Sequence, residues 1–159
     1  MMCGIPTAGK SFTPGEEDLA AALHYLEPGE RQLLVGYLHG REFPVGEVVI
    51  KEKERANCMA FVVSGKLAVK QQTAFPGKHA LVAILESGTV VGELSVLERG
   101  IRMATVEVLE VSRLLILSSD DFDRLLEEDP KLGIKILKRI LHVVSIRIKK
   151  ADDRLARLL

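Results

Sequence analysis

The sequence has no tryptophan, only two cysteines in 159 residues, and no net charge at neutral pH. Cys3 and Cys58 lie far apart and form no CxxC pair, which argues against a structural zinc site and favours two free, apolar cysteines in a reducing compartment. The balanced charge gives the whole chain no electrostatic attraction for nucleic acid or an anionic membrane. No uncharged run reaches the ~18 residues of a membrane span, and the first residues do not resemble a secretory signal. We therefore expect a cytoplasmic protein of one domain.

The first residues contain a motif typical of nucleoside triphosphatases. The stretch GIPTAGKS, residues 4–11, has the glycine and lysine spacing of a phosphate-binding loop. Such a loop needs a buried strand before it and a helix after it, whereas only three residues precede Gly4 and Pro14 follows soon after Ser11. We interpret the match as coincidental. Residues 1–15 are rich in Gly, Pro, Ser and Thr, and we expect them to form a flexible leader.

Periodicity divides residues 16–159 into helical ends and a β-rich middle. Residues 16–39 predict two helices, of which the first begins with acidic residues and the second with a proline. From residue 43 to residue 117, short β-branched runs alternate with turn residues, and the pair Ser64 and Gly65 predicts a two-residue hairpin. Strands this close together, without long helices between them, indicate an antiparallel β-roll or jelly roll. We therefore expect one α+β domain over residues 16–159, with N-terminal helices and a long C-terminal helix.

The long C-terminal helix is predicted over residues 130–158, with Asp129 as its N-cap and Pro130 in its first turn. Apolar residues recur along it in steps of three and four, as in a coiled coil, and a shorter apolar stripe occupies another face. The helix would extend about 42 Å, longer than a small barrel can cover. We assign the short stripe to the β-roll and the long seam to a second copy of the chain; packing on its own barrel alone is the alternative. The seam comprises Ile134, Leu137, Leu141, Val144, Ile148, Ala151, Leu155 and Leu158, and the stripe comprises Ile136, Ile140 and Val143.

The most informative stretch is GTVVGELSVLERGIRMATVEV, residues 88–108. Gly92 permits a tight turn after a strand, and the following ELSVLE can form a helical turn with free amide groups at its start. Arg102 comes ten residues after Gly92, directly before a strand. A guanidinium that meets such amides forms a compact anion site, and Glu93 can accept a hydrogen bond from a hydroxyl. The pattern indicates a phosphate with a neighbouring sugar hydroxyl; the alternative is a Glu93–Arg102 ion pair that only fixes the loop.

This stretch resembles the phosphate-binding cassette of cyclic-nucleotide-binding domains, roughly F-G-E-L-A-L-x-x-x-x-P-R-A-A-T-V, with the spacing from Gly92 to Arg102 preserved. Upstream, FPVGEVVIKEKERANCMAFVVSGKLAV is similar to the family's F-x-x-G-x-x-I and Y-x-I-x-x-G blocks. Downstream, Phe122 and Pro130 fit the last two helices of the family. The resemblance covers about residues 20–159 and points to sensor domains like that of the catabolite activator protein.

The resemblance implies specific roles for the cassette residues. Glu93 would accept a hydrogen bond from the ribose 2′-hydroxyl, Arg102 would neutralise the cyclic phosphate, and backbone amides would complete the site. Met103 stands where guanine-selective members have Ser or Thr, so cyclic AMP is expected over cyclic GMP, although Met is bulky. Ile101 replaces the cassette proline, which loosens the loop, and Arg147 is either a base-stacking residue or a solvated charge. The expected ligand-binding residues are Gly92, Glu93, Leu94, Arg102, Met103, Ala104 and Arg147.

The resemblance also implies a regulatory role without enzymatic activity. We expect a cyclic AMP sensor that acts through its C-terminal helix, as a homodimer or on a separate effector protein. Nothing follows Leu159, so we expect no DNA-binding domain in the chain, and no membrane partner. The alternative is a degenerate domain that binds no nucleotide and serves as a protein-interaction scaffold, as Ile101 and Met103 suggest. A metal-dependent enzyme on a related roll would need clustered ligands, whereas the four histidines are isolated, so we expect no metal or cofactor.

Overall fold

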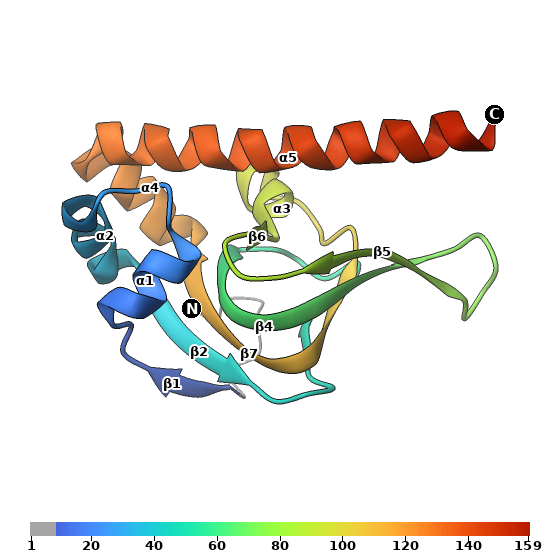
Figure 1. Ribbon diagram of the computed structural model, residues 1–159, viewed down its shortest axis with the longest axis horizontal. Coiled ribbons are helices and arrows are strands. Elements are labelled where there is room, and N and C mark those ends of the chain that lie inside the picture. The colour runs from blue at the N-terminus through green and yellow to red at the C-terminus, as the bar shows by residue number, and fades with distance from the viewer. Residues whose placement is uncertain (1–8) are drawn as a thin grey trace.

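The computed structural model describes residues 9–159, which form an antiparallel β-roll flanked by helices (Figure 1). The α+β fold class expected from the sequence is confirmed. None of the helices within the described range combines the length and apolar character needed to span a membrane. In chain order the elements are β1 (Lys10–Phe12), α1 (Glu16–Ala22), α2 (Pro28–Leu34), the 3-10 helix η1 (Val35–Tyr37), β2 (His39–Phe43), β3 (Val48–Ile50), β4 (Cys58–Gln72), β5 (His79–Leu85), β6 (Val90–Val91), α3 (Glu93–Glu98), β7 (Thr105–Ser118), α4 (Ser119–Glu128) and α5 (Pro130–Leu158).

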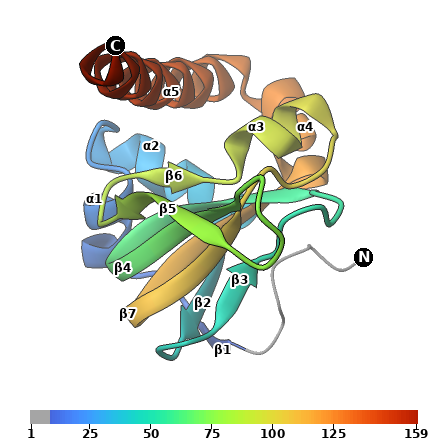
Figure 2. The same cartoon turned by 90° about the vertical axis from the view of Figure 1, so that its right-hand side faces the viewer.

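The strands form one sheet that curls into the roll (Figure 2). Their order is β1-β2-β7-β4-β5, with β3 paired to β7 and β6 paired to β4, and each pairing is antiparallel. The two longest strands, β4 and β7, pair along most of their length. The roll is therefore built around this pair, and β5 forms one edge of the sheet.

Alternation along β4 and β7 divides the core into two clusters, because successive side chains of a strand point to opposite faces. Met59, Phe61 and Val63 belong to the cluster that includes residues of the helices. Ala60 and Val62 belong to the cluster formed by strand residues inside the roll. The helices thus cover one face of the sheet, and the other face curls around its own apolar side chains.

Gly65 lies within the continuous strand β4, so the predicted hairpin at Ser64 and Gly65 is wrong. The pairing of β4 with β7 shifts register on both sides of Ser64, as in a β-bulge. Gly65 has a φ of +94°, and a Cβ atom there would lie 2.5 Å from the carbonyl oxygen of Val111. The glycine therefore permits a close approach of two backbones at a bulge and does not reverse the chain.

The flexible leader expected over residues 1–15 is contradicted in its second half, because Lys10–Phe12 form β1 and pair with β2. The guanidinium of Arg41 donates to Ser11 Oγ at 2.6 Å, and that of Arg113 stacks on the Phe12 ring with its Cζ atom 3.9 Å from the ring centroid. Most of the GIPTAGKS motif lies outside the described residues. Its last two residues lie in a strand, which is not the geometry of a phosphate-binding loop.

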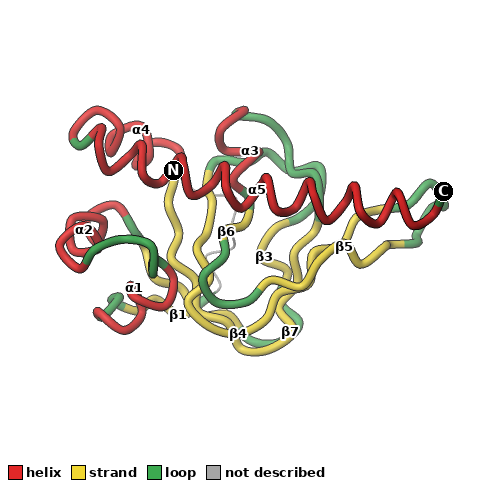
Figure 3. Tube along the Cα trace, turned by 45° about the horizontal axis from the view of Figure 1, so that its top comes forward, coloured by secondary structure: helices red, strands yellow, loops and turns green. Residues whose placement is uncertain are grey.

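Helix α5 starts as the sequence predicts, with the Asp129 side chain accepting a hydrogen bond from Leu132 N at 3.2 Å. It runs across the top of the roll, and its C-terminal end lies at the same end of the molecule as the β4–β5 hairpin (Figures 1 and 3). The short apolar stripe of Ile136, Ile140 and Val143 is buried, as expected. The first half of α5 is therefore anchored in the core of its own domain.

The long seam is shared between two sides of α5. Leu137 and Val144 pack against the domain's own core, and Ala151 lines a cavity, so the assignment of these three residues to a partner helix is not supported. Most of the remaining seam residues recur every seven residues on the outer face of the helix. These exposed residues are Ile134, Leu141, Ile148 and Leu155, followed by Leu158.

Candidate functional site

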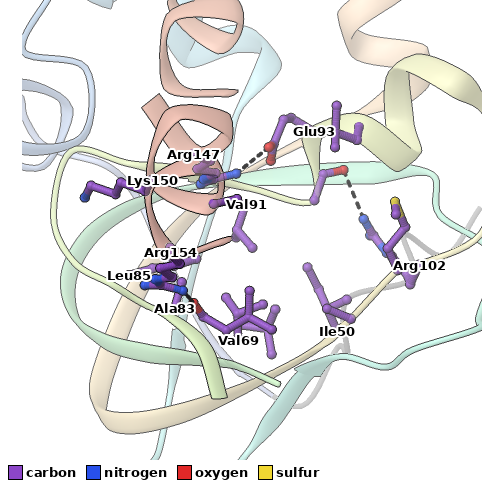
Figure 4. Close-up of a pocket in the computed structure, with 17 residues that line it drawn as sticks. Ile50, Val69, Ala83, Leu85, Val91, Glu93, Arg102, Arg147, Lys150 and Arg154 are labelled. Carbon is purple, nitrogen blue, oxygen red and sulfur yellow. Dashed lines mark hydrogen bonds and ion pairs between the residues drawn. The ribbon is translucent and has the colours of Figure 1, made fainter. Parts of the chain in front are cut away.

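A cavity of about 260 Å³ lies between the cassette, β5 and the second half of α5. Figure 4 shows Arg102 at one side of the cavity and Arg147, Lys150 and Arg154 at the other, with apolar side chains between them. All seven residues expected from the sequence line this one cavity: Gly92, Glu93, Leu94, Arg102, Met103, Ala104 and Arg147. The cavity therefore combines an apolar interior with charged groups from the cassette and from α5.

The turn at Gly92 connects β6 directly to α3 and requires a glycine. Its φ is +79°, which side chains other than glycine rarely adopt. A Cβ atom there would lie 2.5 Å from Arg102 Nη1 and 3.2 Å from Ile50 Cδ1. The absence of a side chain thus leaves space for the Arg102 guanidinium beside the cassette backbone.

Replacing Gly92 with alanine is expected to lower the free energy of unfolding by about 1–2 kcal/mol, because the left-handed backbone is strained for an L-residue. The added methyl group would also displace the Arg102 guanidinium. Thermal unfolding measures the stability change. Gly100→Ala is the matched control, since a Cβ atom at Gly100 meets nothing within 4 Å. Equal unfolding temperatures for the two variants would contradict this account of the turn.

Arg102 is buried, with 2% of its surface exposed. Its Nη1 donates to Gly92 O at 3.2 Å, and its Nη2 donates to Cys58 O at 2.8 Å. Burial lowers the pKa of Arg102, and the carboxylates of Glu54 and Glu93 oppose this shift. In the described part of the chain, Arg102 Nε is a buried donor that lacks a hydrogen-bond partner. Arg102 therefore places a positive charge in the lining of the cavity, and its Nε keeps an unused hydrogen bond.

Cys58 is disulfide-bonded, which contradicts the expectation that it is a free cysteine. The chain's other cysteine, Cys3, lies outside the described residues. The carbonyl oxygen of Cys58 is one of the two that hold the Arg102 guanidinium.

The loop before Arg102 is held by backbone hydrogen bonds in place of the cassette proline. Arg102 N donates to Glu54 O at 2.8 Å, Lys53 N donates to Arg102 O at 2.9 Å, and Ala56 N donates to Gly100 O at 3.1 Å. The loosening expected from Ile101 is therefore offset by pairing with residues 53–56. Met103 is 60% exposed at the rim, so its side chain does not fill the cavity.

Glu93 forms an ion pair with Arg147 of α5, and the alternative Glu93–Arg102 ion pair is not formed. The Glu93 side chain is 3% exposed, and the Arg147 side chain is 34% exposed. Arg147 also donates to Val90 O and, at 3.3 Å, to Thr89 Oγ1. Arg147 is thus not a solvated charge, because it connects α5 to the start of the cassette. Its role in stacking on a base stays a prediction.

Several cavity residues lie outside the cassette and were missed in the sequence. Val82, Ala83 and Leu85 come from β5, and Lys150 and Arg154 come from α5. The α5 residues follow Arg147 at helical spacing, which places them on one face and could have indicated them. The β5 residues carry no comparable signal, because their place depends on how the sheet curls. Within residues 9–159, no group of three or more His, Cys, Asp or Glu residues is placed to hold a metal ion.

The fold and the cassette match known proteins. The chain is 27% identical over 129 residues to the cyclic AMP receptor protein of Thermus thermophilus, covering 81% of this chain and 57% of that protein. The crystal structure of the Thermus thermophilus catabolite activator protein superimposes with a TM-score of 0.71 at 28% identity, over 89% of this chain and 62% of that one. A cyclic nucleotide-binding domain from Methylobacillus flagellatus KT superimposes with a TM-score of 0.87 at 19% identity, over 94% of this chain and 89% of that domain, and shows the shared fold. The sequence profile named "Cyclic nucleotide-binding domain" matches residues 40–129, more than half of the chain. The chain therefore belongs to the family of cyclic nucleotide-binding domains.

Proposed function

We propose that the cavity binds a cyclic nucleotide, with cyclic AMP as the favoured ligand, and that the chain is a regulatory domain without catalytic activity. The observation that carries this proposal is the Arg102 guanidinium, a buried positive charge in the lining of an apolar cavity, with an Nε that lacks a partner among the described residues. A cyclic phosphate would neutralise Arg102 and accept hydrogen bonds from the amides of Gly92, Leu94 and Ala104. Glu93 would accept a hydrogen bond from the ribose 2′-hydroxyl.

The preference for cyclic AMP rests on Met103 and on the relatives. Met103 has no hydroxyl to donate to a guanine base, so cyclic GMP gains no additional hydrogen bond there. One relative is named as a cyclic AMP receptor protein. The apolar interior suits a purine, whose faces gain from contact with aliphatic side chains.

Cyclic AMP is expected to stabilise the folded protein, whereas cyclic GMP should do so less at the same concentration. A ligand at 100 times its Kd adds about 2.7 kcal/mol to the free energy of unfolding when it binds only the folded state. Thermal unfolding and calorimetric titration with both nucleotides measure this. Absence of heat and of stabilisation with either nucleotide at millimolar concentration would refute the proposal.

We further propose that the output is transmitted through α5, by pairing with a second copy of the chain or by contact with a separate effector protein. The support is the exposed apolar row on its outer face, with Leu141 67% and Leu155 61% exposed. Apolar residues that recur every seven residues are typical of a seam between two helices.

The alternative function, a scaffold that binds no nucleotide, is favoured by one observation. Glu93 already has a charged partner, Arg147, within the same chain. A site whose carboxylate is internally neutralised needs no ligand for its stability. The titration described above separates the two proposals.

A further inference from the structure

Residues 52–56, between β3 and β4, run antiparallel to residues 100–105, the second half of the cassette loop. Glu52 N donates to the Thr105 side chain at 3.1 Å, which joins the two segments at the end nearest the sheet. None of residues 52–56 lines the cavity. This segment can therefore influence a bound ligand only through the cassette loop.

The main chain of Arg102 is held on both sides by this segment. Arg102 N donates to Glu54 O at 2.8 Å, and Lys53 N donates to Arg102 O at 2.9 Å. The Arg102 side chain is held separately, by the carbonyl oxygens of Gly92 and Cys58. A binding group is placed accurately only when the residues around it hold it in position. The two main-chain bonds thus fix the point from which the guanidinium reaches the cavity.

Lys53 has a left-handed backbone with a φ of +71°, although it is not a glycine. A residue with a side chain rarely adopts this conformation, and it persists only where surrounding contacts hold it. The Lys53 side chain is exposed, so packing of the side chain does not hold it. The hydrogen bond from Lys53 N to Arg102 O is the contact that does. The strained conformation therefore serves the backbone of Lys53 and not its side chain.

The cassette of this chain lacks the proline that would restrain the backbone directly before Arg102, and Ile101 stands in its place. We infer that Lys53 is a positioning residue for the phosphate site, an inference that rests on the proposed role of Arg102. Its amide holds the carbonyl group of Arg102 and supplies the restraint that the missing proline does not. The charge of Lys53 takes no part in this role.

Two substitutions at Lys53 separate its backbone from its charge. Lys53→Gly keeps the amide and tolerates a positive φ, so it should bind cyclic AMP within about twofold of the wild-type affinity. Lys53→Pro removes the amide hydrogen and requires a φ near about −65°, so it is expected to bind cyclic AMP about tenfold more weakly. Both variants lose the same charge, and the difference between them reports the backbone alone.

A second substitution distinguishes positioning of Arg102 from a general loss of structure. Ile101 pairs with Arg55 across the two segments, and the hydrogen bonds of this bridge are made by the residues on either side of each. Ile101→Pro leaves those bonds in place and restrains the chain directly before Arg102. Added to Lys53→Pro, it should recover most of the lost affinity. A merely structural role for Lys53 predicts no recovery.

Calorimetric titration with cyclic AMP measures the affinities of the wild type, the two single variants and the double variant. A folded Lys53→Pro protein with the affinity of Lys53→Gly, or a loss that Ile101→Pro does not reduce, would overturn the role of Lys53. If Lys53→Pro does not fold, Lys53→Val takes its place, because a β-branched residue also disfavours a positive φ. It should weaken binding relative to Lys53→Gly, and equal affinities would refute the inference.

Amide hydrogen exchange of Arg102 without ligand tests the inference separately from the proposed function. Exchange at Arg102 should be faster in Lys53→Pro than in Lys53→Gly, because the segment that accepts from its amide is released. If none of the proteins, including the wild type, binds a cyclic nucleotide, the proposed function fails. The exchange rates then decide whether Lys53 positions Arg102, and equal rates in the two variants would refute it.

Discussion

The Arg102→Ala protein is expected to bind cyclic AMP about 100-fold more weakly than the wild-type protein, beyond the range of an ordinary titration. A hydrogen bond to a charged group contributes about 1.5–3 kcal/mol, and a factor of ten in Kd corresponds to about 1.4 kcal/mol. Arg102 would supply both a charge and a buried donor to the phosphate, and its Nε is a donor that the protein itself leaves without a partner.

Arg102→Ala should also destabilise the fold in the absence of ligand. The guanidinium satisfies the carbonyl oxygens of Gly92 and Cys58, and a buried acceptor left without a donor costs about 1–3 kcal/mol. Thermal unfolding measures this effect in the absence of ligand, and titration is then performed below the unfolding temperature of the variant.

Two further variants complete the test: one separates the charge of Arg102 from its geometry, and the other is a control in the same loop. Arg102→Lys keeps the positive charge but lacks the planar fork that reaches two carbonyl groups, so it should retain weak binding. Arg99→Ala, in the same loop, removes an exposed arginine whose partner Asp123 is also exposed, and should leave binding unchanged. A folded Arg102→Ala protein with the affinity of the wild type would show that the phosphate is not bound at Arg102.

The grouping of the cassette residues around one cavity could be predicted from the sequence, because these residues are close together in the chain. The turn at Gly92, the start of α3 and the return of Arg102 within ten residues are local features, and the structure brings all of them to one cavity. The partner of Glu93 could not be predicted in this way. Arg147 lies 54 residues further along the chain, and only the packing of α5 across the roll brings the two side chains together.

The errors in the fold prediction have similar causes. Gly65 was interpreted as a hairpin glycine because short-range rules cannot distinguish a turn from a bulge in a long strand. Lys10–Phe12 contain no strong strand signal of their own, and they form a strand because β2 offers an unpaired edge. The seam on α5 was correctly periodic, but periodicity alone does not say which apolar row packs on the domain itself and which remains exposed.

Replacing Leu141 with glutamate is expected to convert the proposed dimer into a monomer. Leu141 lies on the row that α5 exposes, between Ile134 and Ile148. In a symmetric pair of helices one substitution introduces two carboxylates into the same interface, so its cost is counted twice. Burial of each unpaired polar group costs about 1–3 kcal/mol, which together weakens association about 100-fold or more.

Sedimentation equilibrium at micromolar concentration measures this effect, and His142→Glu provides the matched control. His142 is the next residue of the helix, is exposed, and receives the same carboxylate about 100° away from the exposed row. Because Leu141 has no part in the core of its own domain, thermal unfolding of a monomeric Leu141→Glu protein should remain cooperative. A wild-type chain that sediments as a monomer, or a Leu141→Glu protein that remains dimeric, would exclude pairing through this row. The exposed face of α5 would then be left for a different protein partner.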